Sequence, residues 1–320
     1  MRENDAMRRV AILILLFVTS GLHAASRWSL QSNPWVNLHQ RLMYQTKFND
    51  ATDPIGLDPA QLAQWKKAVD AYRVWIAGRH PIFNRELIAL NEALSRTTGD
   101  KLPDSIPKGA ADVLNAAMPL YRSGQWQEDD RANRFFIAYA EPLLASAGEE
   151  LAQEHAKVYG VAFPSHIHVD VTAYAWQFGA YTVGDEDHAQ TVMSSIDPGY
   201  QGFSALEMLL HEPSHVIVDT TTGAIGGDLT RISRELGVKT PPNLWHAILF
   251  YTSSELTRRA LAKRGVTTTF TPSMIGMYTH GFKDFRHALE THWQGYLDGK
   301  ITKEAALRAI LTELVQRKVQ

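Results

Sequence analysis

Two histidines four residues apart, with a glutamate between them, are the residues whose chemistry is easiest to name. They are His211, Glu212 and His215 of the pentapeptide His-Glu-Pro-Ser-His. On a helix, side chains four residues apart lie on one face, so both imidazoles can reach one metal ion. The glutamate beside them can take a proton from a water that the ion activates. The pattern predicts half of a zinc hydrolase site.

The motif lies in an apolar stretch, residues 203–219, which predicts a helix that is buried on nearly all sides. Two histidines and a glutamate are costly there unless a metal or a hydrogen-bonding partner compensates them. The alternative to a metal site is a pair of core histidines bonded to the backbone, with Glu212 paired to an arginine. Pro213 has no N–H to donate to the Leu209 carbonyl, so we expect a kink between the two histidines.

A third metal ligand is expected downstream, because catalytic zinc usually takes three protein ligands and a water. The candidates are Asp219, His246, Glu255 and His280. Asp219 follows His215 by four residues on the same face, which suits an acceptor that orients a ligand better than a ligand itself. The alternative for Asp219 is a solvated carboxylate at a helix end.

Residues 241–251, Pro-Pro-Asn-Leu-Trp-His-Ala-Ile-Leu-Phe-Tyr, predict a helix whose prolines fit its first turn and whose second turn carries His246. Together with the first motif, this segment resembles the gluzincin-like metallopeptidases of the zincin clan. Those proteins carry their third ligand on a second helix, in a pattern like P-x-W-L-x-E-G-L-A-x-Y. The matching positions are Pro241, His246, Ala247 and Tyr251. Histidine therefore stands where the family has its ligand glutamate.

Glu255 competes with His246 for the third position, because it lies among apolar residues of the same helix and a buried carboxylate is stabilised by a cation. Nine residues separate the two, which places them on opposite sides of a regular helix. We favour His246, because imidazole is a common zinc ligand and Ser253 allows close approach. The other residue is then expected to orient a ligand or to pair with Arg258 or Arg259.

The resemblance implies both a fold and a reaction. The fold is a zincin-like α+β fold, mostly α, in which a small mixed or antiparallel sheet lies beside the buried H-E-x-x-H helix, with helical parts at both ends. The edge strand borders the cleft and can pair with an extended substrate, and residues 166–183 are in the right place for it. One zinc ion per chain is implied, with Glu212 as the general base. Tyr278 or His280 is the candidate donor to the developing oxyanion.

The first 25 residues predict a secretory signal peptide. Arginines precede an apolar run over residues 10–18, and small residues follow it. That run is too short to span a bilayer, and no second run approaches the roughly 20 residues needed, so we expect no transmembrane anchor. Since the chain has no cysteine, it forms no disulfides. These features predict export to a bacterial periplasm or secretion.

Composition and charge limit the function further. A hydrophobic fraction of 45% and eight tryptophans are enough for a large core. The formal net charge of −2 provides no basic field for nucleic acid. The resemblance to metallopeptidases implies a peptide or another amide substrate as the partner.

Hydrophobic periodicity predicts helix along most of the chain. The stretch directly after the signal looks helical, and further helices are expected over residues 59–77, 84–97, 107–122, 130–146, 147–159, 242–263, 281–297 and 303–318. Strict alternation, with Ile167, Val169 and Val171 on one face, predicts strands over residues 166–171, 176–183 and 190–195. We therefore expect a helical N-terminal subdomain over residues 26–160 and a zincin-like, metal-binding catalytic subdomain over residues 161–320.

Two other metal motifs fit less well. His166, His168 and Asp170 are similar to the H-x-H-x-D-H signature of metallo-β-lactamases, but Val171 takes the place of the last histidine. We interpret these residues as the solvated face of a strand. Glu212 begins an E-x-x-H of the di-iron bundle kind, which requires a second copy that the sequence lacks. The prediction is an exported zinc metallopeptidase, with a non-catalytic zincin-like binding or structural protein as the alternative.

Overall fold

The computed structural model describes residues 26–48, 52–219, 222–268 and 282–319, so the predicted signal peptide lies outside the described residues. The elements, in chain order, are β1 (Trp28–Gln31), α1 (Pro34–Gln45), α2 (Pro59–Ile76), α3 (Arg85–Ser95), α4 (Lys108–Ser123), α5 (Gln125–Tyr159), β2 (His166–Thr172), β3 (Ala180–Gly184), β4 (His188–Ser194), η1 (Pro198–Tyr200), α6 (Phe203–Ser214), α7 (Gly226–Glu235), α8 (Leu244–Ala262), η3 (Lys283–Phe285), α10 (Arg286–Ala288), η4 (Leu289–Trp293), α11 (Gln294–Leu297) and α12 (Lys303–Val319).

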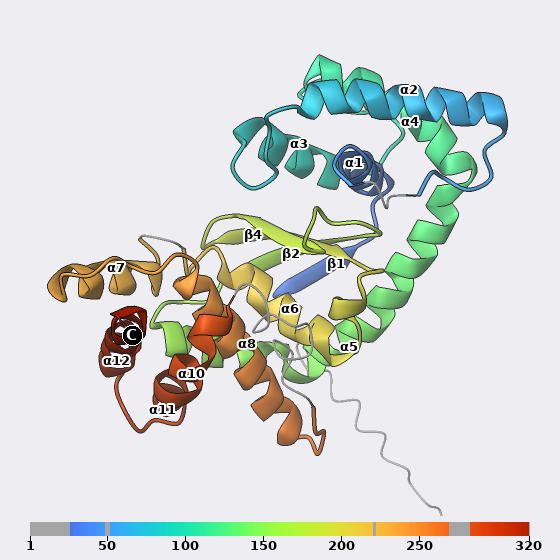
Figure 1. Cartoon of the computed structure of the whole chain (residues 1–320). Coiled ribbons are helices and arrows are strands. Elements are labelled where there is room, and N and C mark those ends of the chain that lie inside the picture. Colours follow the sequence, from blue (N-terminus) through green and yellow to red (C-terminus); the bar gives the residue numbers. More distant parts are fainter. Residues whose placement is uncertain (1–25, 49–51, 220–221, 269–281, 320) are drawn as a thin grey trace, which may run out of the picture.

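A small mixed sheet lies between two layers of helices (Figure 1). Its strand order is β1-β2-β4-β3, with β1, β2 and β4 parallel and β3 antiparallel to β4. Helices α1 to α4 cover one face, and α6 and α8 lie beyond the other. The expectation of a mostly helical α+β protein with a small mixed sheet is confirmed.

The two faces of β2 differ as the alternation predicts, but both are covered. Ile167, Val169 and Val171 point to the core that contains α5, α6 and α8. Asp170 points the other way and is fully buried, where its carboxylate accepts hydrogen bonds from the Gln31 side chain at 2.7 Å. The prediction of a solvated face holds for His166, which is exposed, and in part for His168, but it is wrong for Asp170, because α1 and the end of α3 pack over this part of the sheet.

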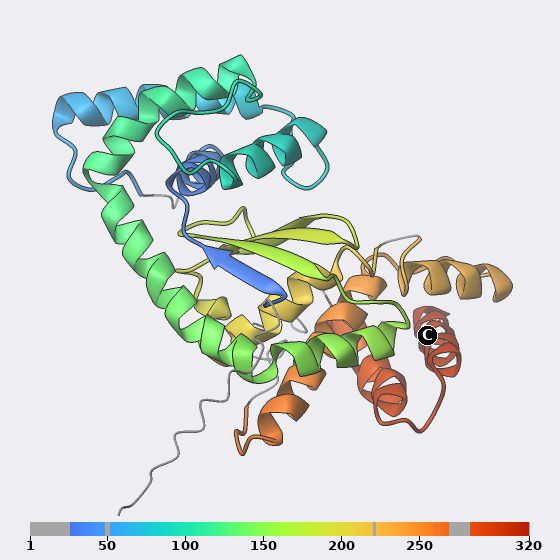
Figure 2. The same ribbon diagram turned by 180° about the vertical axis from the view of Figure 1, so that it is seen from behind.

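Helix α5 connects the two helical layers as one element (Figure 2). Two helices, 130–146 and 147–159, were expected from the sequence, but Gly148 near their junction does not interrupt α5. Instead Gly148 lets the Trp28 ring approach, since a Cβ atom built there would lie 3.0 Å from it. This glycine therefore serves packing and not a turn.

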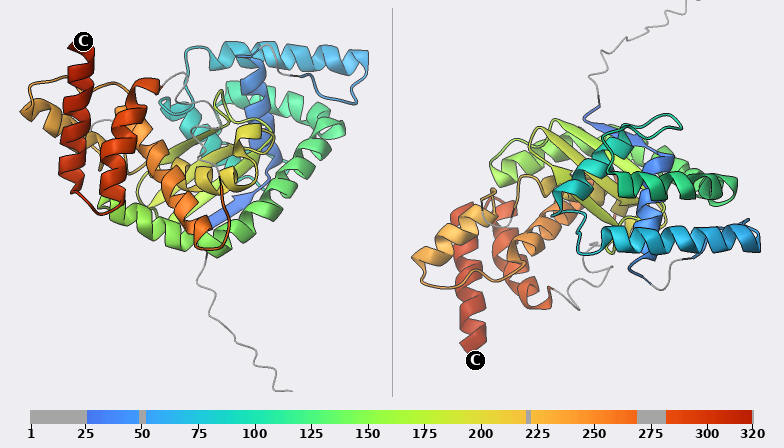
Figure 3. Two further views of the ribbon diagram at one scale, coloured as in Figure 1. Left: turned by 60° about the horizontal axis from the view of Figure 1, so that its bottom comes forward. Right: turned by 90° about the horizontal axis from the view of Figure 1, so that it is seen from above.

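Other local signals are confirmed, and some elements have no sequence signal. Helix α2 begins with the Asp58 capping box, and the Thr302 hydroxyl accepts from the backbone N–H of Ala305 at the start of α12. The stretch after residue 25 begins with strand β1 before helix α1, and α7 was not expected. The segment expected as one helix over 281–297 consists of short pieces that include the π-helical turn η4. Figure 3 shows these pieces beside α12.

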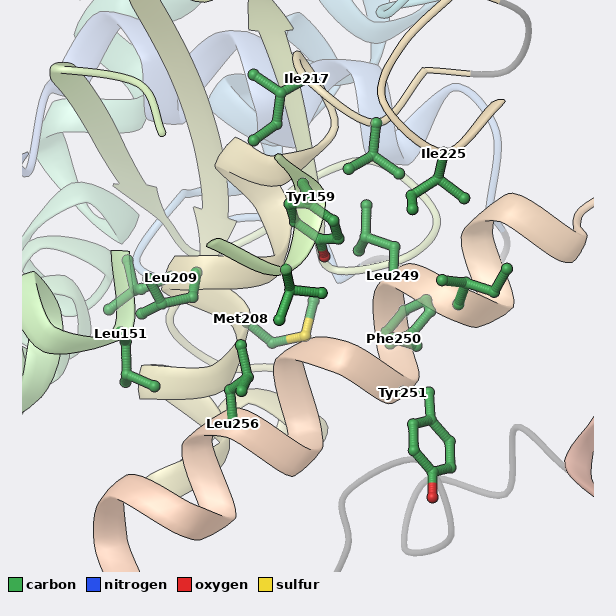
Figure 4. Packing of buried hydrophobic residues seen from close by; sticks show 14 of the residues in the cluster. Leu151, Tyr159, Met208, Leu209, Ile217, Ile225, Leu249, Phe250, Tyr251 and Leu256 are labelled. Carbon is green, nitrogen blue, oxygen red and sulfur yellow. The ribbon is translucent and has the colours of Figure 1, made fainter. Parts of the chain in front are cut away.

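The hydrophobic core forms two clusters, one on each side of the sheet. The cluster on the side of the sheet away from α1 to α4 joins α5, α6 and α8. Figure 4 shows Met208, Leu249 and Phe250 packing within it. Because α5 contacts both layers, the predicted boundary at residue 160 stays a prediction. Among the described helices, none has the length and apolar character needed to cross a membrane.

Two buried histidines outside the metal motif predict loss of stability in acid. Burial lowers the pKa of His39 and of His155 from 6.5 to about 4. Between these values the unfolded chain binds more protons than the folded chain, so stability falls as the pH falls. Urea unfolding should show a loss of about 1.4 kcal/mol per pH unit for each ring. His39→Asn should make the free energy of unfolding depend less steeply on pH, whereas His188→Asn, at an exposed position, should leave that dependence unchanged. Equal pH dependence in the His39 variant and the wild type would show that His39 does not cause the loss of stability in acid.

Candidate metal centre

Helix α6 lies in the interior, and this position gives the motif its environment. The helix follows Gly202, whose φ of 60° favours glycine, and every residue from Ser204 to Ser214 is buried. It packs against α5, α8 and strands β3 and β4. The expectation of a helix that is buried on nearly all sides is confirmed.

Pro213 shortens the helix, and a distant residue compensates the lost hydrogen bond. The Leu209 carbonyl, which Pro213 cannot reach with an N–H, accepts from the indole nitrogen of Trp28 at 3.1 Å. Helix α6 ends at Ser214, and the N–H of His215 bonds to the Glu212 carbonyl at 3.1 Å in a tighter last turn. The effect of the proline is therefore an early helix end.

Three histidines from two helices come together at this end of α6. His211 and His215 are joined by His246 from the first turn of α8. One ring nitrogen of each lies within 4.8 Å of those of the other two. The ring centroids are 4.9 to 5.4 Å apart. A zinc–nitrogen bond measures about 2.0–2.1 Å, so small side-chain rotations bring the three rings onto one ion.

Several ring nitrogens of the triad have no hydrogen-bond partner among the described residues, as expected if they bind a metal ion. Among the described residues, neither nitrogen of buried His211 has a partner, and Nε2 of His246 has none. Buried polar atoms are nearly always paired. The alternative of core histidines bonded to the backbone requires the partners that His211 lacks. The residues present therefore fit a metal ion.

Burial also holds the three rings in the state that binds metal. It lowers the pKa of His211 and His246 well below 6.5, and the neighbouring rings lower it further. The pKa of His215 falls to about 4 through burial alone. Since a metal binds the neutral imidazole, the triad is available as a ligand set at neutral pH.

Aromatic rings pack against the triad. The ring centroids of Phe250 and His211 are 3.8 Å apart. The Trp245 and His246 rings are stacked, with their centroids 5.0 Å apart and an angle of 17° between the ring planes. Phe282 contacts His246 edge-on at 5.7 Å. An apolar surround of this kind strengthens electrostatic interactions at a bound ion.

Glu212, the neighbour of His211 in sequence, is buried, and its carboxylate is held by the sheet. Its Oε2 accepts from the Thr182 hydroxyl at 3.1 Å, and that hydroxyl contacts Thr191 at 2.9 Å across strands β3 and β4. With Thr182 donating to the carboxylate, Thr191 donates to Thr182. Burial raises the pKa of Glu212 to about 8, and the Thr182 bond opposes that rise. A carboxylate in this setting is suited to exchange a proton near neutral pH.

The Thr182 contact gives a first prediction for the site. Thr182→Val keeps the side-chain shape but removes the donor, so Glu212 loses its anchor to β3. We expect about a tenfold loss in kcat/KM for any hydrolysis that depends on Glu212, with the metal content unchanged. Thr182→Ser, which keeps the hydroxyl, should restore most of the rate. Full activity in the valine variant would show that the contact has no part in the reaction.

The rival third ligand does not join the triad. Glu255 binds Arg258 and Arg259, each at 2.7 Å, as expected for the residue not taken as ligand. Burial alone would raise the pKa of Glu255, but the two arginines hold it below its ordinary value. His246 and Glu255 thus lie on different sides of α8, as their spacing predicts.

The remaining candidates are placed differently or lie outside the described residues. Asp219 was expected on the same helix as His215, but α6 ends at Ser214, so that position is wrong. Its carboxylate accepts from the backbone N–H groups of Thr222 and Gly223 at 2.8 and 3.0 Å. Its role in orienting a ligand stays a prediction. The expected oxyanion donors, Tyr278 and His280, fall in residues 269–281, outside the described part.

Two residues that hold α6 in place, Thr182 and Trp28, were not predicted from the sequence. Thr182 and Trp28 act on α6 from strands far away in the chain. A polar threonine on an otherwise apolar face of a strand is the one sequence feature that points to the role of Thr182. The missing N–H of Pro213 indicates that the Leu209 carbonyl needs another donor, but the sequence does not identify it as Trp28.

Comparison with protein-family models, with curated proteins and with solved structures finds no match to this chain.

Proposed function

We propose that this protein is an exported zinc-dependent metallohydrolase of zincin-like fold that cleaves peptide bonds. His211, His215 and His246 would hold one zinc ion, and Glu212 would act as general base. The observation that carries the proposal is the histidine triad around the buried His211, whose two ring nitrogens have no partner among the described residues, next in sequence to the buried carboxylate of Glu212.

A bound zinc ion supplies a Lewis acid that polarises the substrate carbonyl and makes a water more acidic. The Glu212 carboxylate takes a proton from the attacking water, whose oxygen forms a bond to the amide carbon. As the carbon–nitrogen bond breaks, Glu212 returns that proton to the leaving nitrogen. Thr182 keeps the carboxylate in place through both proton transfers.

The position of β3 supports a peptide as substrate. In the described part of the chain, β3 is an outer strand of the sheet and pairs only with β4. Thr182 on this strand holds Glu212, so the strand's unpaired edge lies near the proposed base. An extended peptide could add to such an edge through its backbone. Export, proposed from residues 1–25, would place the enzyme among periplasmic or secreted polypeptides.

Hydrolysis of a protein and a peptide substrate tests the proposal. The purified protein, loaded with zinc, should cleave casein or a quenched-fluorescence peptide library. A chelator should abolish the cleavage, and added zinc should restore it. Zinc-loaded protein that cleaves neither substrate would contradict the proposal and favour the non-catalytic binding protein.

A further inference from the structure

Hydrogen bonds connect a buried carboxylate with an exposed serine on the face of the sheet that α1 and the end of α3 cover. The carboxylate belongs to Asp170 on β2, and the serine is Ser29 on β1, an outer strand in the described part of the chain. The strand register places Ser29 opposite His168 and Gln31 opposite Asp170. Because the three metal-site histidines lie on α6 and α8, beyond the other face, these hydrogen bonds take no part in the metal chemistry.

The donors and acceptors between Asp170 and Ser29 can be assigned one after another. A carboxylate only accepts, so the Ser95 hydroxyl donates to Asp170 Oδ1 at 3.1 Å. The Ser95 oxygen then accepts from Nε2 of His168 at 2.9 Å. In a neutral imidazole the other nitrogen carries no proton, so Nδ1 accepts from the Ser29 hydroxyl at 3.0 Å. His168 is therefore oriented as a base toward the hydroxyl of Ser29.

Asp170 also compensates the charge that His168 gains when it takes a proton. Its Oδ1 lies 3.4 Å from Nε2 of His168. The side-chain amides of Gln31 and Gln190 donate to this carboxylate at 2.7 and 2.8 Å and keep it in place. A hydroxyl within hydrogen-bond reach of a base that a third group orients is the arrangement of an activated serine nucleophile.

Exposure favours Ser29 over Ser95 as a nucleophile. Ser95 is 7% exposed, and its proton is held by Asp170. Ser29 is exposed, and the side chain of His168 is 24% exposed. A substrate from solution can therefore reach the Ser29 oxygen and the Nδ1 atom beside it, while the carboxylate that orients the base stays fully buried.

The outer edge of β1 supplies a donor for the oxyanion that forms during acyl transfer. The N–H of Ile167 donates to the Arg27 carbonyl at 2.8 Å, so Arg27 and Ser29 direct their backbone groups toward β2. Alternate residues of a strand direct these groups to opposite sides. The N–H of Leu30 therefore faces away from β2, directly after Ser29 in the chain, which is where such a donor acts in serine hydrolases.

A second serine–histidine contact in the chain lacks the buried carboxylate. Ser165 Oγ lies 3.0 Å from Nδ1 of His166, and both residues are exposed. Among the described residues, no ion pair joins His166 to an acidic side chain. The two contacts have the same length and differ in the group behind the histidine. Ser165 is therefore a control within the same molecule.

We propose that Ser29 and His168 form a second catalytic site, which hydrolyses esters and needs no metal. Ser29 Oγ bonds to the ester carbonyl carbon while its proton passes to His168 Nδ1. As the bond between that carbon and the leaving alcohol oxygen breaks, His168 gives the proton to the alcohol. Water then bonds to the acyl carbon and gives a proton to His168, which returns it to Ser29 as the acid leaves. This inference does not depend on the proposed zinc site.

A fluorophosphonate probe, which modifies activated serines covalently, tests the nucleophile directly. The purified full-length protein is incubated with the probe, and peptide mass spectrometry measures the rate at which each serine is modified. Ser29 should react at least about 100-fold faster than Ser165, and His168→Gln should remove this difference. Equal rates at the two serines in the wild type, or no modification of Ser29, would overturn the proposal.

Hydrolysis of p-nitrophenyl acetate measures turnover at the same site. Ser29→Ala and His168→Gln should each lower kcat/KM at least about 100-fold, whereas Ser165→Ala should leave it unchanged. In samples of the wild type quenched with acid, mass spectrometry should find the acetyl group on Ser29. A wild-type rate in the folded Ser29→Ala protein would refute the ester-hydrolysing site.

Ser95 and Asp170 are positioning residues, because they act through His168. Ser95→Ala removes the hydroxyl between the ring and the carboxylate, so it should lower kcat at least about tenfold and leave KM within a fewfold. Ser95→Thr keeps the hydroxyl and should restore most of the rate, which a merely structural role would not explain. A folded Ser95→Ala protein with the wild-type kcat would refute the role given to these two residues.

Discussion

Replacing Glu212 by glutamine is expected to abolish peptide hydrolysis while the metal stays bound. Glutamine has nearly the same shape, and its carbonyl oxygen can accept the Thr182 hydroxyl, so the local structure should persist. It cannot carry the proton between the water and the leaving nitrogen. General acid–base catalysis contributes about 10²- to 10⁴-fold, and a rate loss in that range is expected. Steady-state kinetics on one peptide, with metal analysis of the same sample, measures both effects.

Glu255→Gln is the matched control for this variant. Glu255 is also a buried carboxylate near the seam of the two helices, but its partners are Arg258 and Arg259. Its replacement should leave the rate per folded molecule within a fewfold of the wild type. An unaltered rate in Glu212→Gln would contradict the proposed mechanism, whatever the control shows.

Zinc is expected to stabilise the folded chain strongly, because it would bind three imidazoles, two of which, His211 and His246, have buried ring nitrogens without a partner among the described residues. At a free concentration of 100 to 1,000 times its dissociation constant, a ligand adds about 2.7 to 4.1 kcal/mol to the free energy of unfolding. For a chain of this size that corresponds to an increase in Tm of roughly 4 to 7 °C. Thermal unfolding with zinc, and with a chelator, measures the difference.

The variants His246→Ala and His166→Ala make this test specific. His246 is a proposed ligand, whereas His166 is exposed at the start of β2. Zinc should stabilise the His166 variant as much as the wild type and should lose most of its effect on the His246 variant. Equal melting temperatures with zinc and with chelator in the wild type would show that these rings bind no zinc.

The parts of the site that lie close together in sequence are predictable, because helix periodicity alone decides them. His211, Glu212 and His215 needed only a helix, and the nine-residue spacing on α8 already separated His246 from Glu255. The triad also needs the contact between α6 and α8. That contact was expected from the resemblance and not from the spacing.

The parts that depend on distant contacts could not be predicted from one sequence. Strand β1 is four residues long, and it forms because Trp28 and its neighbours pair with β2. Asp170 alternates like a solvated residue, yet helices far away in the chain cover it. Thr182 reaches Glu212 only through the packing of β3 on α6. In each case the structure depends on packing between segments that are far apart in the chain, and local sequence patterns contain no information about that packing.

Metal content is the most direct test of the central claim. Elemental mass spectrometry on purified wild type, His211→Ala, His246→Ala and Glu255→Ala would measure zinc per chain in samples equilibrated with equal zinc. The triad predicts about one zinc per chain in the wild type and in the Glu255 variant, and little in the two histidine variants. A wild type that holds no metal after zinc is supplied would contradict the histidine triad as a zinc site. If Glu255→Ala loses zinc and His246→Ala keeps it, Glu255 is the third ligand instead of His246.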